Sequence, residues 1–358
     1  MVKVLHVYPE MKSAGTEMVI MNLYRNIDRE RVQFDLLTMR EGESDDAFRA
    51  LGAQVHRIPK TKSYKRDLVA FFRAHPEYKI VHAHTHKEMG EVLRAAKVAG
   101  VPCRIAHSHN SRSDLPKIMK LYKMLTGWHI ESSATHFLAC SREAAEWLFP
   151  RKHKRAQVWN NAIDLDAFRF DTEARKSVRA QLGIPEEARV IAHVGRFADQ
   201  KNHTFIVRLL NRLTAEDASL YAILVGDGPL FDEIRAEAKS ERILFLGQRK
   251  DVPALLSASD MFLFPSHYEG LGIVAVEAEA SGLFCLASDG VPAAADIGIG
   301  LFRRMSLSDS DDTWCDRIKE ILNTASRENR SERSMLAFDT DYNIHKIAKM
   351  AEEFYLQA

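Results

Sequence analysis

Residues 261–287 read MFLFPSHYEGLGIVAVEAEASGLFCLA, and this stretch determines the fold that we expect. An apolar run over Met261–Phe264 is followed by a polar loop, a helical segment and a second apolar run over Phe284–Ala287. Both runs are continuous rather than alternating, which is typical of parallel strands that are buried on both faces of a sheet. The stretch therefore predicts a strand–loop–helix–strand unit of a parallel α/β sheet.

The same alternation of strands and helices extends along the rest of the chain. Further short apolar runs predict strands at Val2–Val7, Phe34–Thr38, Val55–Ile58, Ile80–His84, Arg104–His107, His136–Ala139, Val190–Val194, Tyr221–Val225 and Ile243–Leu246. Segments with helical spacing separate the strands of the first half, at Glu17–Ile27, near Asp45–Leu51, at Asp67–Ala74 and at Met89–Ala99. Strands separated by helices indicate βαβ units, and we expect doubly wound, Rossmann-like α/β architecture in both halves.

The length of 358 residues predicts two domains, since a domain has roughly 100–200 residues. The polar segment Asn160–Phe170 has no periodicity, so we place the boundary there, with domains over 1–165 and 166–343. A C-terminal helix over about 344–358 can pack back on the first domain. Ligands of such sheets bind beyond the carboxyl ends of the strands, and two facing domains predict a site in an interdomain cleft.

The composition excludes several classes of protein. Hydrophobic residues make up 46% and charged residues 28%, which is ordinary for a globular chain. No apolar stretch approaches the roughly 18 residues of a membrane span, and the N-terminus lacks a signal-peptide pattern, so we expect a cytoplasmic protein. The four cysteines form no C-x-x-C pair, which argues against a disulfide framework or a zinc knuckle.

Charge is distributed unevenly between the two halves. Residues 1–165 carry 27 Lys and Arg against 18 Asp and Glu, whereas residues 166–358 carry 23 against 31. On a helix, three lysines would face away from an apolar stripe; they are Lys117, Lys120 and Lys123, opposite Ile118, Leu121, Tyr122, Leu125 and Trp128. This pattern predicts either peripheral contact with an anionic membrane or a core-packed helix with solvated lysines. No nucleic-acid-binding motif accompanies the charge, so we expect no nucleic-acid partner.

The most specific motif is Glu269–Gly282, which reads EGLGIVAVEAEASG. Glu269 lies in the loop after the strand, and Glu277 falls in the first turns of the following helix. Carboxylates there can accept hydrogen bonds from ligand hydroxyls, while Gly270 and Gly272 let the backbone approach a ligand closely. Taken alone, the two glutamates could equally be solvated side chains of a strand–loop–helix joint.

Two further motifs stand at predicted strand ends. Gly195-Arg196 follows the strand Val190–Val194, and Lys201 adds a second cation in the same loop. Arginine offers a bidentate fork and lysine a mobile point charge, so a diphosphate is the natural partner. The turn Val225–Pro229, VGDGP, is a weaker signal because turns of this composition are common.

Together these motifs resemble the retaining glycosyltransferases of family four, which have the GT-B fold, and the resemblance covers most of the chain. Residues 21–28 (MNLYRNID) and 104–110 (RIAHSHN) are similar to the bacterial exopolysaccharide and capsule branch. Members of the family transfer a sugar from a nucleotide donor, usually a UDP-sugar in this branch. They do so with retention of anomeric configuration and without an essential metal or cofactor.

The resemblance implies a role for each matching position. Arg196 and Lys201 would hold the donor diphosphate and stabilise the leaving group. Glu277 would bind the ribose hydroxyls and Glu269 the donor sugar. Other implied donor-side positions are Gly15, Gly226, Gly247, Gln248, Gly270, Leu271, Gly272 and Ile273. The chain departs from the family at Ala14, where a second glycine commonly precedes Gly15.

Histidines form the last group of candidates. The family carries a histidine near the reacting sugar, and alignment favours His109, with His107 second; we expect His109 to join Glu269, Arg196 and Lys201 as a catalytic residue. His82, His84 and His86 alternate along a strand, which permits a metal site. Because no acidic or cysteine cluster accompanies them, we expect a polar strand end and no metal.

The expected function is a retaining glycosyltransferase that moves a hexosyl or N-acetylhexosaminyl group from a nucleotide sugar to a growing polysaccharide or lipid-linked glycan. A polyprenyl-diphosphate-linked acceptor and an anionic membrane surface are candidate partners, with the inner face of the cell membrane as a candidate location. Two alternatives remain: a nucleotide-sugar epimerase of the same fold class, and a non-catalytic donor-binding partner of another glycosyltransferase.

Overall fold

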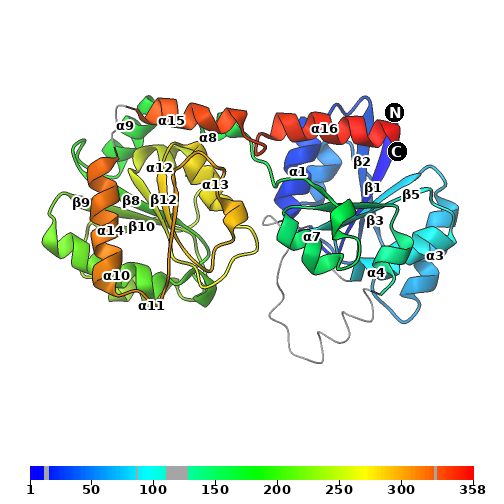
Figure 1. The fold of residues 1–358 in the computed structure, drawn as a ribbon, viewed down its shortest axis with the longest axis horizontal. Helices are drawn as coiled ribbons and strands as arrows, with labels where there is room; N and C mark the ends of the chain where they lie inside the picture. The colour runs from blue at the N-terminus through cyan, green and yellow to red at the C-terminus, as the bar shows by residue number, and fades with distance from the viewer. Residues whose placement is uncertain (12–15, 86–87, 110–127, 326–328) are drawn as a thin grey trace. The chain divides into compact units, whose positions relative to one another are not determined.

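The computed structural model of the chain describes residues 1–11, 16–85, 88–109, 128–325 and 329–358. It divides into two compact units, Met1–Ala162 with Ile344–Ala358, and Ile163–Asn343. Within the described residues, the first unit has a parallel sheet of seven strands and the second a parallel sheet of six (Figure 1). The expectation of two doubly wound α/β domains is confirmed. The boundary that we placed after residue 165 falls after Ala162 in this division.

The sheet of the first unit has the strand order β3-β2-β1-β4-β5-β6-β7. Its strands are β1 (Val2–Tyr8), β2 (Val32–Thr38), β3 (Val55–Arg57), β4 (Ile80–Ala83), β5 (Cys103–Ser108), β6 (His136–Ala139) and β7 (Gln157–Val158). The first strand in sequence is thus central, and its neighbour β4 comes from a segment more than 70 residues away. In this register His6 lies opposite His82, and His82 lies opposite Ile105.

Helices cover both faces of this sheet. They are α1 (Thr16–Asn26), α2 (Asp45–Ala50), α3 (Tyr64–Ala74), α4 (Met89–Val98), α6 (Ile130–Ser133), α7 (Arg142–Leu148), the 3-10 turn η2 (His153–Arg155) and α16 (Ile344–Gln357). Val4 packs in the core under α1 and α16, and Leu5 packs in the core on the opposite face. The C-terminal helix α16 lies beside α1 in the first unit (Figure 1).

The second unit repeats the scheme with the order β10-β9-β8-β11-β12-β13. Its strands are β8 (Arg189–Val194), β9 (Leu220–Val225), β10 (Ile243–Phe245), β11 (Met261–Phe264), β12 (Phe284–Ser288) and β13 (Phe302–Met305). Its helices are α8 (Leu165–Phe168), α9 (Thr172–Gln181), α10 (His203–Glu216), α11 (Phe231–Glu237), α12 (Val252–Ala258), α13 (Ile273–Ala280), α14 (Asp311–Thr324) and α15 (Arg330–Leu336), with 3-10 turns η3 (Asp199–Lys201), η4 (Ala293–Ala295) and η5 (Ala337–Asp339).

Local sequence explains where several helices begin. The Asp171 carboxylate accepts hydrogen bonds from the backbone N–H groups of Glu173 and Ala174 and so caps α9, and the Ser310 hydroxyl accepts one from Thr313 at the start of α14. In the described part of the chain, none of the helices combines the length and the apolar character that a membrane span needs.

Candidate functional site

In the second unit, backbone hydrogen bonds connect the segments at the ends of β8, β9 and β10. The N–H of Gly195 donates to Val225 O at 2.9 Å, and the N–H of Gly226 donates to Gly247 O at 2.8 Å. Gly226 has φ +135°, and a Cβ there would lie 2.0 Å from Gly195 O. Only glycine permits this approach. The glycines of the two predicted strand-end motifs therefore form one continuous glycine-rich edge.

Gly195 is fixed by its side-chain neighbours as well. A Cβ at this position would lie 3.0 Å from His193 Nε2 and 3.1 Å from Lys201 Cδ. His193 is fully buried, and its Nδ1 lies 2.8 Å from Leu263 O. Since a carbonyl oxygen only accepts hydrogen bonds, Nδ1 carries the proton and Nε2 has the lone pair. His193 was not singled out in the sequence, because a buried histidine within an apolar strand gives no motif.

Lys201 and Glu269, predicted separately as donor-site residues, form an ion pair. The distance from Lys201 Nζ to Glu269 Oε1 is 2.7 Å, and the two side chains are 15% and 7% exposed. The Lys201 ammonium also lies 4.8 Å from the centre of the Phe264 ring. Gln200 joins the two loops, because its side-chain amide donates to Tyr268 O at 3.0 Å. The loops after β8 and β11 are thus held together by charge and by hydrogen bonds.

Helix α13 begins at this edge and carries the second glutamate. Gly272, at φ +79°, precedes its first residue, and a Cβ there would lie 3.1 Å from the Phe264 ring. Glu277 lies in the second turn of α13. Burial raises the pKa of its carboxyl to about 8, and the charge of Lys201 acts in the opposite direction. The raised pKa favours the protonated form of this carboxyl, which can both donate and accept a hydrogen bond.

The remaining donor-side predictions lie on the same loops, apart from one. Arg196 is exposed in the loop between β8 and η3. Gln248 and Gly270 are exposed, and Leu271 and Ile273 are half-buried. Gly15, with Ala14, lies outside the described residues. One sheet edge thus combines two cations, two carboxyl groups and glycine-rich backbone, which is chemistry suited to a polar ligand with a diphosphate.

The two predicted histidines of the first unit lie in a buried cluster. His107 and His109 are 4% and 3% exposed. They contact His82 and His84 of the neighbouring strand: His107 Nδ1 lies 3.0 Å from His82 Nε2, and His109 Nε2 lies 2.8 Å from His84 Nδ1. The alternating spacing predicted that His82 and His84 share a face, whereas His86 lies outside the described residues.

Two members of this cluster were missed by the sequence analysis. His6 of β1 places its Nδ1 3.0 Å from His84 Nε2. The hydroxyl of Tyr355, near the end of α16, lies 2.7 Å from His82 Nδ1. Neither residue belongs to a motif, and only the position of β1 next to β4 and the packing of α16 bring them to the cluster.

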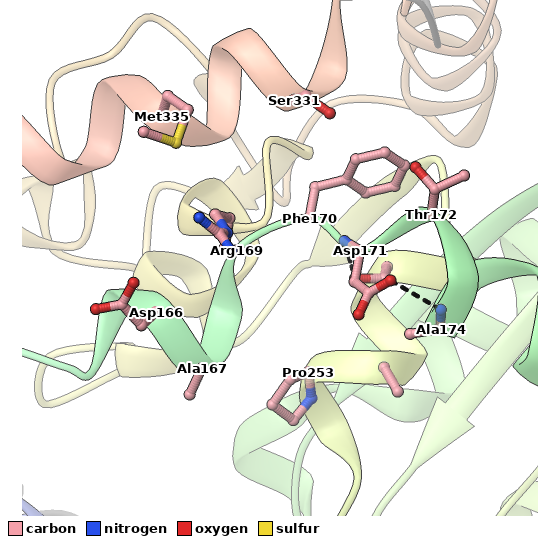
Figure 2. Close-up of a pocket in the computed structure, with 12 residues that line it drawn as sticks. Asp166, Ala167, Arg169, Phe170, Asp171, Thr172, Ala174, Pro253, Ser331 and Met335 are labelled. Atoms are coloured by element: carbon pink, nitrogen blue, oxygen red, sulfur yellow. Dashed lines mark hydrogen bonds between the residues drawn. The ribbon is translucent and has the colours of Figure 1, made fainter.

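A separate groove of about 650 Å³ lies on the second unit between α8, α9, α12 and α15 (Figure 2). None of the predicted donor-side residues lines it. Figure 2 shows that its Asp171 carboxylate is engaged by the backbone of α9, where it accepts from Ala174 N at 3.0 Å. This carboxylate therefore serves to cap the helix, and we assign no ligand to the groove.

Comparison with known proteins identifies the family. Residues 13–167 match the family described as Glycosyltransferase Family 4, and residues 174–334 match the family described as Glycosyl transferases group 1. The Bacillus subtilis protein with the name "Putative glycosyltransferase EpsF" is 34% identical to this chain over 362 residues. The aligned residues cover 96% of this chain and 94% of EpsF.

A more distant relative is also named as a glycosyltransferase, and a solved structure shares the fold. An Escherichia coli protein named UDP-Gal:alpha-D-GlcNAc-diphosphoundecaprenol alpha-1,3-galactosyltransferase is 27% identical, covering 80% of this chain and 79% of its own length. The crystal structure of Alr3699/HepE from Anabaena in complex with UDP superposes on this chain with a TM-score of 0.83 at 19% identity. The superposition covers 100% of each chain. The two sheets, the sequence matches and the near full-length similarity to EpsF show that the chain belongs to the glycosyltransferases of family four, with the GT-B fold.

Proposed function

We propose that this glycosyltransferase moves a hexosyl or N-acetylhexosaminyl group from a UDP-sugar to a growing polysaccharide or lipid-linked glycan, with retention of anomeric configuration. The carrying observation is the Lys201–Glu269 pair at the glycine-rich edge of the second unit. The names of similar proteins support the chemical class: the E. coli relative is named for a UDP-Gal donor and a diphosphoundecaprenol acceptor, and the Anabaena structure holds UDP. A role in exopolysaccharide or capsule biosynthesis is part of this proposal.

The donor diphosphate is proposed to bind at Lys201 and Arg196. A lysine ammonium has three N–H donors, so Lys201 can keep its bond to Glu269 and still donate to phosphate oxygens. Arg196 is exposed and can offer its guanidinium fork to the same group. The backbone of Gly270–Ile273, at the start of α13, supplies further donors for phosphate.

The nucleoside is proposed to lie along the glycine-rich edge. The carboxyl of Glu277 would bind the ribose hydroxyls, and the backbone around Gly226, Gly247 and Gln248 would border the base. Glu269, held in place by Lys201, would accept hydrogen bonds from hydroxyls of the donor sugar. In this arrangement, each carboxyl recognises hydroxyl groups and neither has to act as a nucleophile.

The reaction follows from this placement. The bond between the anomeric carbon and the diphosphate oxygen breaks, and an acceptor oxygen forms a bond to the same carbon on the same face. The acceptor proton passes to the departing phosphate oxygen. Arg196 and Lys201 stabilise the negative charge that develops on the diphosphate. Electrostatic stabilisation of this kind, by cations already held in place, is usually the largest contribution to catalysis. We propose that this step needs no divalent metal, because the two cations take that role.

The acceptor is proposed to bind to the first unit, whose residues 1–165 carry the excess of basic residues. A polyprenyl diphosphate and anionic headgroups would complement this charge at the inner face of the cell membrane. The lysine-rich segment with Lys117, Lys120 and Lys123 lies outside the described residues, so its membrane contact stays a prediction. The resemblance also assigns His107 and His109 to the acceptor side, but both side chains are buried, at 4% and 3% exposed.

A turnover assay with a panel of radiolabelled nucleotide sugars tests the function. Transfer of label to a polyprenyl-diphosphate-linked glycan, with the product anomer matching the donor anomer by NMR, is the expected result. An epimerase would instead isomerise the nucleotide sugar without acceptor, and a non-catalytic partner would bind UDP without turnover. Either of those results, or an inverted product, would contradict the proposal. Arg196→Ala serves as the low-activity control.

A further inference from the structure

Five histidines converge on one face of the first unit's sheet. They come from three adjacent strands and the residues just after them: His6 from β1, His82 and His84 from β4, and His107 and His109 from β5. Alternate residues of a strand share a face, and the register places His6 opposite His82 and His82 opposite Ile105, two residues before His107. All five side chains are therefore on the same side, and each residue is at most 4% exposed.

The cluster surrounds a small cavity under α1 and α16. The cavity has a volume of about 20 Å³. The five histidines line it together with Val19, Ile20, Leu23, Trp159, Asn160, Ala162, Ile344 and Ile347. A volume of this size holds about one water molecule or one ion. The remaining walls are mostly apolar, so the imidazole rings dominate the chemistry that an occupant would meet.

His84 and His107 each use one ring nitrogen to contact a histidine of the neighbouring strand. His84 Nε2 is engaged by His6 Nδ1 at 3.0 Å, and His107 Nδ1 is engaged by His82 Nε2 at 3.0 Å. His82 in turn lies 2.7 Å from the Tyr355 hydroxyl through its Nδ1. The other ring nitrogens are His84 Nδ1, which lies 2.8 Å from His109 Nε2, and His107 Nε2, which has no hydrogen-bond partner among the described residues.

We propose that His84, His107 and His109 bind one transition-metal ion of the zinc class. One ring nitrogen from each of these residues can be chosen so that all three lie within 4.8 Å of one another. Zn–N bonds of about 2.0–2.1 Å in tetrahedral geometry separate the nitrogens by about 3.3 Å, so the three rings would have to draw closer when the ion binds. Three imidazoles with a water as fourth ligand is an established zinc arrangement.

The surroundings of the rings favour this ligand set. Metal-binding histidines are normally oriented by a hydrogen bond at the other ring nitrogen, and His6 and His82 stand in that place for His84 and His107. A site of nitrogen ligands alone selects Zn²⁺, Co²⁺, Ni²⁺ or Cu²⁺ over Mg²⁺, Mn²⁺ and Ca²⁺, which prefer oxygen.

This site is distinct from the proposed donor site. Its ligands belong to the first unit, whereas the proposed diphosphate cations belong to residues 163–343. The proposed ion is not required for departure of the diphosphate, and the proposal of a metal site does not depend on the proposed function. It gives His107 and His109 a role as ligands, in place of the sugar contact that the resemblance implies, and metal analysis decides between these roles.

The test uses the full chain without a histidine tag, stripped of metal with a chelator and titrated by calorimetry with Zn²⁺, and separately with Mg²⁺. We expect one Zn²⁺ per chain, no Mg²⁺ binding, and visible absorption typical of tetrahedral Co²⁺ when cobalt replaces zinc. His107→Phe, which keeps an aromatic ring in the core, should abolish binding. His6→Phe removes only an orienting partner and should weaken binding about 10–100-fold. His56→Phe, in the same unit but outside the cluster, is the matched control.

The wild-type cobalt spectrum keeps the test valid if a variant fails to fold. Absence of stoichiometric Zn²⁺ binding by the wild type, together with absence of the cobalt bands, overturns the proposal. Retained binding in His107→Phe with loss in His6→Phe overturns the proposed ligand set. Equal losses in His56→Phe and His107→Phe would show that the loss is not specific to the cluster, and would overturn the proposed ligand set.

Discussion

Replacing Lys201 by methionine tests whether its pair with Glu269 is structural as well as functional. The two charged atoms are 2.7 Å apart and the side chains are 15% and 7% exposed, so each charge depends on the other. Removal of one partner of a buried pair costs about 3–5 kcal/mol, because the remaining charge stays buried without compensation. Since both side chains keep some contact with water, we expect a loss near the low end, about 3 kcal/mol, for Lys201→Met.

Glu269→Gln should lower the free energy of unfolding less than Lys201→Met does. The amide keeps an oxygen that can accept a hydrogen bond from Lys201, and the ammonium keeps its place 4.8 Å from the centre of the Phe264 ring. We expect a loss of about 2 kcal/mol, smaller than for Lys201→Met, because the hydrogen bond from Lys201 is kept and only the compensating charge is lost. The double variant should lose less than the sum of the two single variants, by a coupling energy of about 2 kcal/mol.

Urea unfolding followed by far-UV circular dichroism gives these free energies, and calorimetry with UDP gives affinity. A surface pair in the same unit provides the control: Glu173 and Lys176 are 3.1 Å apart but 83% and 59% exposed. Glu173→Gln with Lys176→Met should show a coupling below about 1 kcal/mol. Lys201→Met should also weaken UDP binding by about 10–150-fold, which corresponds to the loss of one charge-assisted hydrogen bond.

Two results would refute this reasoning. Additive single effects, within about 0.5 kcal/mol, would show that Lys201 and Glu269 are not energetically coupled. Unchanged UDP affinity in Lys201→Met, despite lower stability, would show that the lysine supports the loops only and that the diphosphate assignment is wrong. The single substitution thus separates the structural role of the pair from its proposed role in binding.

Three further predictions follow from the same edge of the sheet. Arg196 is exposed, so Arg196→Ala should weaken UDP binding in calorimetry by about 10-fold or more without lowering the free energy of unfolding, and a large loss of stability would contradict this. The pKa of Glu277 is raised to about 8 from 4.5, so stability that is fully present below pH 4.5 should be lost as the pH rises through 8. Glu277→Gln should remove this dependence, by at most about 1.4 kcal/mol per pH unit, and identical urea-unfolding pH profiles of the two proteins would exclude the shift. Turnover after chelation should not respond to added Mg²⁺ or Mn²⁺; rescue by either ion would mean that a divalent metal assists departure of the diphosphate.

The fold and the donor-side loops were accessible from sequence because parallel strands impose simple constraints. Buried strands need continuous apolar runs, and their carboxyl ends share one edge. Lys201 and Glu269 follow two such strands, so their proximity could be anticipated, although their ion pair could not. The strands that escaped prediction are edge strands: β7 has two residues, both exposed, and β13 carries Arg303 and Arg304.

The histidine cluster could be predicted only in part, because local sequence patterns do not show which strands are neighbours in the sheet. Alternation placed His82 with His84 and His107 with His109. Joining these pairs to His6 required the strand order, in which β1 lies beside β4 rather than at an edge. We expected the C-terminal helix to pack back on the first domain, but the contact of Tyr355 with His82 depends on where α16 lies beside α1. Both facts depend on contacts between residues far apart in sequence, which periodicity cannot report.

The donor-side loops of the second unit and the histidine cluster of the first unit differ in where their residues lie relative to the strands. In the second unit, the candidate residues stand in loops beyond the strand ends, where glycines bring backbone together and Arg196 reaches solvent. A ligand bound there can exchange, as a substrate must. In the first unit, the histidines occupy strand positions and the residues next to them, beneath α1 and α16, and an occupant of their 20 Å³ cavity would be enclosed. Substitution of the exposed Arg196 should therefore act chiefly on affinity and turnover, whereas substitution of Lys201 or Glu269 should lower stability as well. Substitutions in the cluster should act chiefly on the metal binding that we propose for the first unit.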